Sequence, residues 1–185
     1  MANIVKTLML QLYELDNKYC LKLNKFSTNK IILNFFNFIS WLSNGKIWYL
    51  ITFTIPFSST IGIKISFELI SFGLMGTIIY KLLKYKINRP RPYKINQSIN
   101  LGGKILDQFS FPSGHTLHSV IFSLIIIYYF PFFTEILIIF TLLVALSRVI
   151  LGMHFPSDVF VGAFLGYLIF KLFLIYREYE NIIYL

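Results

Sequence analysis

The segment Ser147–Asp158, with the sequence SRVILGMHFPSD, places an arginine, a histidine and an aspartate between two apolar runs. The whole chain has only three histidines and eight acidic residues, so this concentration of polar groups is unusual. Ionisable side chains at membrane segments are costly and usually serve a function. We therefore interpret Arg148, His154 and Asp158 as one side of an active site carried by the helices on either side.

The composition indicates an integral membrane protein with a single domain over residues 1–185. Hydrophobic residues make up 56% of the chain, charged residues 14%, and the mean hydropathy is +0.68. Soluble domains carry about 25% charged residues, so this chain has too few to cover a surface that faces water. The net charge of +9 does not indicate nucleic-acid binding, because the basic residues lie at the ends of apolar runs and in segment 81–104.

Apolar runs predict an all-α membrane bundle of about six transmembrane helices, preceded by an N-terminal amphipathic helix over residues 1–25. The amphipathic helix is expected to lie in the membrane interface or to cover the bundle. Ser43–Lys46 is expected to be the turn of a helical hairpin between the first two spans. The first span is short, so a five-span bundle in which it only dips into the bilayer stays open. The predicted spans are residues 31–42, 47–63, 65–83, 117–133, 136–151 and 159–175.

Two features inside the predicted spans carry further expectations. Gly162 and Gly166 form a small-xxx-small pair, which lets membrane helices approach closely, and we expect it to pack within the bundle rather than to form a dimer. Glu68 lies one turn inside the third span, where a carboxylate at mid-bilayer would cost about 2.5 to 3.5 kcal/mol. We expect Glu68 to reach the headgroups, and a role as a proton or substrate contact is the alternative.

The unusual polar residues of the chain lie at helix ends that share one side of the membrane. With six spans, the third and fifth spans end on the side where the fourth and sixth begin. The loop at residues 85–113 connects the third and fourth spans on this side, and a loop of this length in a compact protein is usually functional. Four segments that are distant in sequence are therefore expected to converge on one layer.

Three cations in this layer, Lys84, Arg91 and Arg148, predict a phosphate site. The guanidinium group of arginine matches two phosphate oxygens at once, and lysine adds a compact charge. Ser113 and Gly114 at a helix start add a hydroxyl, a close backbone approach and free N–H groups. Nucleotide-type cradling is not expected, because the chain lacks a glycine-rich loop that ends in lysine.

Two histidines supply candidate catalytic groups. Asp158 follows His154 by four residues at a helix start, so its carboxylate can orient the imidazole and stabilise the cation that forms when His154 acts as nucleophile. His115 is the predicted general acid. Either histidine alone would more often be a headgroup contact. His118 forms a His-x-x-His pair with His115, but no cysteine and few acids are near, so we expect no metal and a structural or supporting role for His118.

The remaining basic residues of the loop are interpreted as solvated or headgroup charges that can also steer an anionic substrate. These residues are Lys86, Arg89, Lys94 and Lys104.

The spacing of the candidate residues resembles the three signature motifs of the type 2 phosphatidic acid phosphatase (PAP2) superfamily. The matching elements are Lys84-x6-Arg91-Pro92, Pro112-Ser113-Gly114-His115 and Ser147-Arg148-x5-His154-x3-Asp158. The resemblance implies a six-helix membrane bundle that removes phosphate from lipid phosphates or diphosphates through a phosphohistidine, without a metal or other cofactor. By position it assigns phosphoryl binding to Lys84, Arg91, Ser113, Gly114 and Arg148, acid catalysis to His115, and the nucleophile pair to His154 and Asp158.

The resemblance also suggests a multi-pass protein of the bacterial inner (plasma) membrane, with its site on the outer face and both termini in the cytoplasm. Charge counts on the two sides do not decide this orientation. The implied partners are membrane lipids and a lipid phosphate or diphosphate substrate, with no nucleic acid and no obligatory protein partner.

Three functional hypotheses follow. The leading one is a lipid phosphatase, with undecaprenyl pyrophosphate as the first substrate and phosphatidylglycerophosphate, phosphatidic acid or a lipid A phosphate as alternatives. The second is a bundle that binds or transports lipid phosphates without cleaving them. It needs the cations but not an oriented nucleophile at His154. The third is a phosphatase for a soluble phosphoester.

Overall fold

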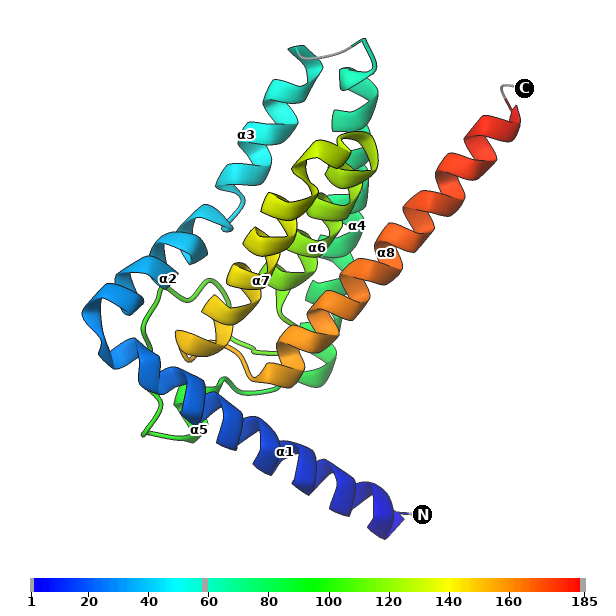
Figure 1. Cartoon of the computed structure of the whole chain (residues 1–185). Helices are drawn as coiled ribbons and strands as arrows, with labels where there is room; N and C mark the ends of the chain where they lie inside the picture. The colour runs from blue at the N-terminus through cyan, green and yellow to red at the C-terminus, as the bar shows by residue number, and fades with distance from the viewer. Residues whose placement is uncertain (1, 58–59, 184–185) are drawn as a thin grey trace.

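The computed structural model describes residues 2–57 and 60–183, and over these residues the chain forms helices and no strand (Figure 1). The all-α prediction is therefore confirmed. The α-helices are α1 (Ala2–Asn24), α2 (Lys30–Leu42), α3 (Lys46–Thr54), α4 (Gly62–Ile87), α5 (Pro92–Ile95), α6 (Gly114–Tyr129), α7 (Thr134–Ile150) and α8 (Pro156–Ile183). Short 3₁₀ helices connect some of them: η1 (Lys25–Thr28), η2 (Ile55–Phe57) and η3 (Pro131–Phe133).

Long apolar helices identify the chain as a membrane protein. Within the described residues, three helical stretches are long and apolar enough to cross a bilayer: Gly62–Ile95, Pro131–Ile150 and Pro156–Glu180. Large apolar side chains such as Phe67 and Phe160 are exposed on these helices, as expected for a surface in contact with lipid. The expected count of six spans is not confirmed.

The expected hairpin between α2 and α3 does not form. The two helices follow one another in nearly the same direction, with a bend between them (Figure 1). Gly45 adopts a left-handed conformation with φ of 83° and directly precedes α3, so the Asn-Gly turn redirects the chain without reversing it. A span needs about 20 residues, whereas α2 has 13 and α3 has 9, so neither helix is long enough to cross the bilayer alone.

Helix α1 and the last turns of α8 lie at opposite ends of the bundle. Helix α1 lies across the end where α7 finishes and α8 begins, whereas α8 finishes at the other end (Figure 1). This arrangement does not agree with the expectation that both termini lie in the cytoplasm.

Helix α6 packs against α4, α7 and α8 and forms the centre of the bundle. The two glycines of α8 face α6: a Cβ atom on Gly162 would lie 2.5 Å from the carbonyl oxygen of Ser113, and one on Gly166 would lie 2.7 Å from that of Leu117. The prediction that the glycine pair packs within the bundle is confirmed. Because α8 approaches so closely, the starts of α6 and α8 lie side by side.

Glu68 is buried inside the bundle, so the expectation that it reaches the headgroups is wrong. The Tyr129 hydroxyl donates a hydrogen bond to Glu68, and an Arg177 nitrogen lies 3.5 Å from the carboxylate. Arg177 also pairs with Glu180, which pairs with Lys64. These partners compensate for the burial of the carboxylate, so the cluster is most simply a polar contact between α4, α6 and α8.

Candidate active site

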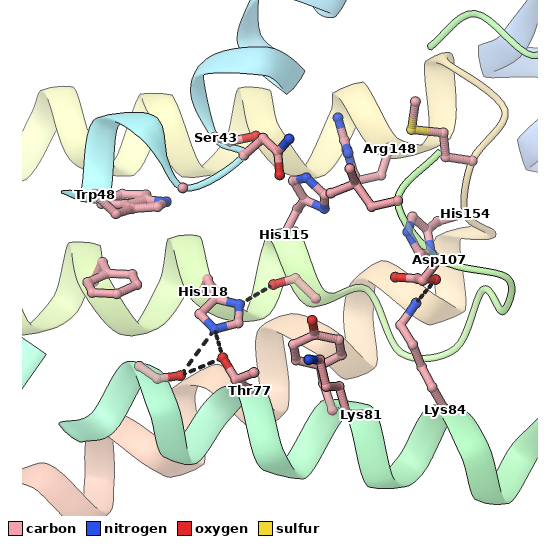
Figure 2. A pocket seen from close by; sticks show the side chains of 18 of the residues that line it. Ser43, Trp48, Thr77, Lys81, Lys84, Asp107, His115, His118, Arg148 and His154 are labelled. Atoms are coloured by element: carbon pink, nitrogen blue, oxygen red, sulfur yellow. Dashed lines mark hydrogen bonds and ion pairs between the residues drawn. The ribbon is translucent and has the colours of Figure 1, made fainter. Parts of the chain in front are cut away.

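The predicted site residues lie on four segments that meet at one end of the bundle. Six of them line a single cavity of about 550 Å³. Figure 2 shows His115, Arg148 and His154 on one side of this cavity and Lys84 on the other. The six residues are Lys84, Arg91, Gly114, His115, Arg148 and His154.

The other two predicted residues, Ser113 and Asp158, are buried next to the cavity and do not line it. The Ser113 hydroxyl shares a hydrogen bond of 2.9 Å with Thr116, and the backbone N–H of Ser113 donates to the carbonyl oxygen of Asp158 at 3.0 Å. Ser113 therefore joins the start of α6 to the start of α8, and its hydroxyl is already engaged.

A tight turn after α7 holds His154 beside Arg148. Gly152 has φ of 68°, a left-handed conformation that glycine adopts without strain. After this turn, the backbone N–H groups of Met153 and His154 both donate to the carbonyl oxygen of Arg148, at 3.0 and 3.1 Å. The turn thus brings two functional side chains that are six residues apart to the same cavity.

The imidazole of His154 faces the carboxylate of Asp158, as predicted, but not at hydrogen-bond distance. Nδ1 of His154 lies 3.7 Å from Oδ2 of Asp158 and has no hydrogen-bond partner among the residues that the structure describes. Oδ2 accepts a hydrogen bond of 2.8 Å from the backbone N–H of Phe155, which anchors the carboxylate beside the ring. Because Nδ1 faces the carboxylate, Nε2 is the ring nitrogen that is available to a substrate.

The surroundings of His154 favour its neutral form. Burial lowers the pKa of His154 well below its usual value of 6.5, and the positive charges of Arg91, Lys84 and Arg148 lower it further. A neutral imidazole carries the lone pair that a nucleophile needs.

Asp107 pairs with two of the three cations that are predicted to bind phosphate. The sequence motifs do not include this residue. Its Oδ1 accepts hydrogen bonds from Nζ of Lys84 and from Nη2 of Arg91, both at 2.8 Å. Burial alone would raise the pKa of Asp107, but the hydrogen bond from Lys84 and the charges of Lys84 and Arg91 lower it below its usual range. Asp107 is therefore an ionised carboxylate in the place where an anionic group of a substrate would bind.

Arg148 provides a cation with unused hydrogen-bonding capacity. Its side chain is buried, its Nε donates to the Ser147 hydroxyl at 3.0 Å, and its Nη2 has no hydrogen-bond partner within residues 2–57 and 60–183. A buried N–H group without an acceptor costs about 1 to 3 kcal/mol, so an anion in the cavity would satisfy it.

His118 connects α6 to α4. Its Nδ1 lies 2.8 Å from the carbonyl oxygen of Gly114, and its Nε2 lies 2.9 Å from the Thr77 hydroxyl and 3.2 Å from the carbonyl oxygen of Gly73 (Figure 2). Both ring nitrogens are thus engaged, which agrees with a structural role.

Arg89 pairs with Asp158 beside the cavity, so its interpretation as a solvated loop charge is wrong. Its Nη1 donates to Oδ1 of Asp158 and to the Ser157 hydroxyl, and its Nη2 donates to Oδ2 of Asp16, each at 2.7 Å. The signal in the sequence was its position two residues before Arg91, which places it at the same helix end.

The cavity has a charged end and an apolar end. From His154 it extends between α3, α4 and α6, where Trp48, Leu74 and Phe122 line it. In Figure 2, Trp48 and His154 lie on opposite sides of the view. A ligand that fills the cavity therefore needs an anionic group joined to an apolar body.

Comparison with known proteins agrees with this architecture. The chain is similar to an undecaprenyl-diphosphatase of Sulfolobus acidocaldarius, with 33% identity over 105 residues, which cover 56% of this chain and 50% of that protein. The match thus spans only about half the length of this relative.

Two solved structures share the fold. LpxE of Aquifex aeolicus aligns with a TM-score of 0.72 and 26% identity, over 89% of this chain and 93% of LpxE. The first transmembrane PAP2 type phosphatidylglycerolphosphate phosphatase from Bacillus subtilis aligns with a TM-score of 0.73 and 24% identity, over 91% and 87% of the two chains. A model of the PAP2 superfamily matches residues 66–182, which include the three motifs. The chain therefore belongs to the PAP2 superfamily.

Proposed function

We propose that this protein is a membrane lipid phosphatase that cleaves a phosphomonoester or a diphosphate through a phosphohistidine intermediate. One observation carries the proposal. A single cavity is lined by Lys84, Arg91 and Arg148, by His115 and His154, and by apolar side chains such as Trp48 and Leu74. The charged end suits a phosphate and the apolar end suits a lipid tail.

In the proposed complex, the phosphoryl group binds among Lys84, Arg91 and Arg148. Its oxygens replace the carboxylate of Asp107 on the first two residues and satisfy Nη2 of Arg148. The backbone of Gly114 at the start of α6 adds N–H groups that are favourable to an anion. Ser113 supports this helix start through its contacts with Thr116 and α8.

In the first chemical step, Nε2 of His154 attacks phosphorus, the N–P bond forms, and the P–O bond to the leaving group breaks. His115 donates a proton to the departing oxygen, an effect typically worth about 100- to 10,000-fold in rate. The charge that develops on His154 is stabilised by Asp158, whose carboxylate faces Nδ1. Water then attacks the phosphohistidine, His115 accepts its proton, and phosphate leaves.

The substrate is proposed to be a lipid phosphate, with undecaprenyl diphosphate first because the Sulfolobus acidocaldarius relative is an undecaprenyl-diphosphatase. Phosphatidylglycerophosphate, phosphatidic acid and a lipid A phosphate are the alternatives. We propose an inner-membrane location with the site on the outer face. A bundle that only binds lipid phosphates is the competing function, and the oriented His154–Asp158 pair favours catalysis.

Phosphate release tests the proposal. The purified protein in detergent with excess EDTA should release phosphate from at least one member of a panel of isoprenoid diphosphates, phosphatidic acid, phosphatidylglycerophosphate and lipid A. His154→Ala should abolish release while the melting temperature stays unchanged. Binding of these lipids without any release would instead support the non-catalytic bundle. Activity that appears only after a divalent metal is added would overturn the metal-free mechanism.

A further inference from the structure

Helix α1 presents a polar face to the loop that carries His154. Asp16, Cys20 and Asn24 are spaced by four residues, so they lie on one side of α1, and each is at most 4% exposed. All three contact residues 150–157. Asn24 donates to the carbonyl oxygen of residue 150 at 2.9 Å, Cys20 lies 3.9 Å from that of residue 154, and Asp16 accepts from the backbone N–H of residue 157 at 2.9 Å.

Several large apolar residues of α1 point away from the bundle. Leu8, Leu12 and Tyr19 are 59%, 54% and 50% exposed. A helix that merely covered the bundle would bury these residues and expose the polar ones. The observed orientation suits a helix that contacts the membrane interface on one side and the loop that carries His154 on the other.

Asp16 and Asp158 share one arginine. One guanidinium nitrogen of Arg89 donates a hydrogen bond of 2.7 Å to Asp158, and the other donates one of 2.7 Å to Asp16. The Arg89 side chain is only 20% exposed, and its guanidinium carbon lies 4.3 Å from the centre of the Phe155 ring. The Ser157 hydroxyl donates to Asp16 and accepts from Arg89, which closes the network. The planar fork of arginine can hold two carboxylates in fixed positions, which the flexible side chain of lysine cannot.

We propose that Asp16 and Arg89 are positioning residues of the reaction, through which α1 holds the carboxylate of Asp158 beside His154. This inference rests on the proposed phosphatase function. Asp16 lies on α1, outside residues 66–182, which match the family, whereas Arg89 lies within them.

The charges explain why two carboxylates are needed. If Arg89 paired with Asp158 alone, it would neutralise the charge that must stabilise the cationic phosphohistidine. Asp16 is a second partner for the same guanidinium. Because Arg89 divides its positive charge between two carboxylates, it offsets less of the attraction between Asp158 and the cation that forms on His154. The titratable groups that act on or respond to Asp158 are Arg89, His154, Cys20 and Lys84.

Substitutions of the two residues, with a matched control for each, test the proposal. Arg89→Gln and Asp16→Asn are compared with Lys86→Gln and Glu14→Gln, which change exposed charges of the same two segments. The readouts are kcat, KM and the acid-side midpoint of the pH profile, with dioleoyl phosphatidic acid and farnesyl diphosphate in detergent micelles as probes. Melting temperatures report folding.

We expect both test variants to lower kcat at least tenfold with KM within twofold of wild type, because the cations that hold the phosphoryl group remain. Arg89→Gln should also move the acid-side midpoint to higher pH, since the loss of a positive charge beside the His154–Asp158 pair favours the protonated, non-nucleophilic form of His154. Asp16→Asn should not raise the midpoint, and the two controls should match wild type. A loss of folded protein would scale the whole profile without moving its midpoint.

Wild-type kcat in both test variants, or an unmoved midpoint in Arg89→Gln, would overturn the positioning role. If Arg89→Gln does not fold, Arg89→Lys replaces it. Arg89→Lys should leave the midpoint near that of wild type but lower kcat, and wild-type kcat in this variant would overturn the role equally. Wild-type protein that releases no phosphate from either probe or from the lipid panel would instead refute the proposed function.

Discussion

Oδ1 of Asp107 lies 2.8 Å from Nζ of Lys84, and it also accepts a hydrogen bond from Arg91 at 2.8 Å. One carboxylate oxygen thus bridges two of the three cations that we propose for the phosphate. A phosphate that takes over these two hydrogen bonds displaces the carboxylate, so we expect substrate binding to include an exchange of anions.

Replacing Asp107 by asparagine should strengthen the binding of phosphate-like anions. The neutral amide competes less well for Lys84 and Arg91, and we expect Asp107→Asn to lower the inhibition constant of orthovanadate about tenfold, which corresponds to ~1.4 kcal/mol. Vanadate inhibition of phosphate release measures this, with Glu14→Gln as the control. Unchanged or weaker inhibition would mean that Asp107 does not compete with the phosphate.

The role of His115 can be tested with substrates that differ in leaving group. His115→Asn should slow phosphate release from a lipid phosphate by about 100- to 10,000-fold, because the departing alkoxide needs a proton. Release from p-nitrophenyl phosphate should fall much less, since p-nitrophenolate leaves without protonation. The ratio of the two rates in the variant and in wild type is the measurement. Equal losses with both substrates would show that His115 is not the acid.

The acid side of the pH profile should report the pKa of His154. Burial and then the charges of Arg91, Lys84 and Arg148 lower this pKa well below 6.5. A histidine with a lowered pKa stays neutral and nucleophilic as the pH falls through 6.5, and activity is lost only as the pH falls through the lowered value. We expect kcat/KM to remain near its plateau at pH 6.5. A midpoint at or above 6.5 that is the same for substrates with different phosphate pKa values would contradict this.

Adding a methyl group at Gly162 should disturb the contact between α8 and α6. The new Cβ would lie 2.5 Å from the carbonyl oxygen of Ser113, which is backbone and cannot rotate away. Overpacking of this kind typically costs about 1 to 3 kcal/mol, and it would also shift the start of α8, where Asp158 lies. Gly162→Ala should therefore lower both the melting temperature and kcat, whereas Phe164→Leu on the exposed side of α8 should change neither. Wild-type stability and kcat in Gly162→Ala would refute this packing argument.

The all-α class was predictable, because the long apolar runs leave few alternatives in a bilayer. The path of α2 and α3 was not predictable, because an Asn-Gly turn is compatible both with a reversal of the chain and with a bend. Only packing against the rest of the bundle decides between the two. Glu68 was misplaced for a related reason. Its cost of burial depends on Tyr129 and Arg177, which lie 61 and 109 residues away in sequence.

The site was only partly predictable. The motif spacings pointed to eight residues, six of which line one cavity, because cations and histidines at helix ends are conspicuous in an apolar chain. Arg89, Asp16 and Asp107 were missed, since each is an ordinary surface charge by residue type. Their importance depends on which charges they face, and the sequence does not contain that information.

The sequence by itself determined that the chain is a membrane protein. It also determined that the unusual polar residues lie at a few helix ends. Both follow from the free-energy cost of placing charge in hydrocarbon. Only the tertiary structure decided how those ends combine. Within residues 2–57 and 60–183, it placed Arg89 between Asp16 and Asp158 and placed Asp107 on two cations, and it turned the polar face of α1 toward His154. The physical reason is that electrostatic interactions depend on distance and burial, which sequence separation does not determine.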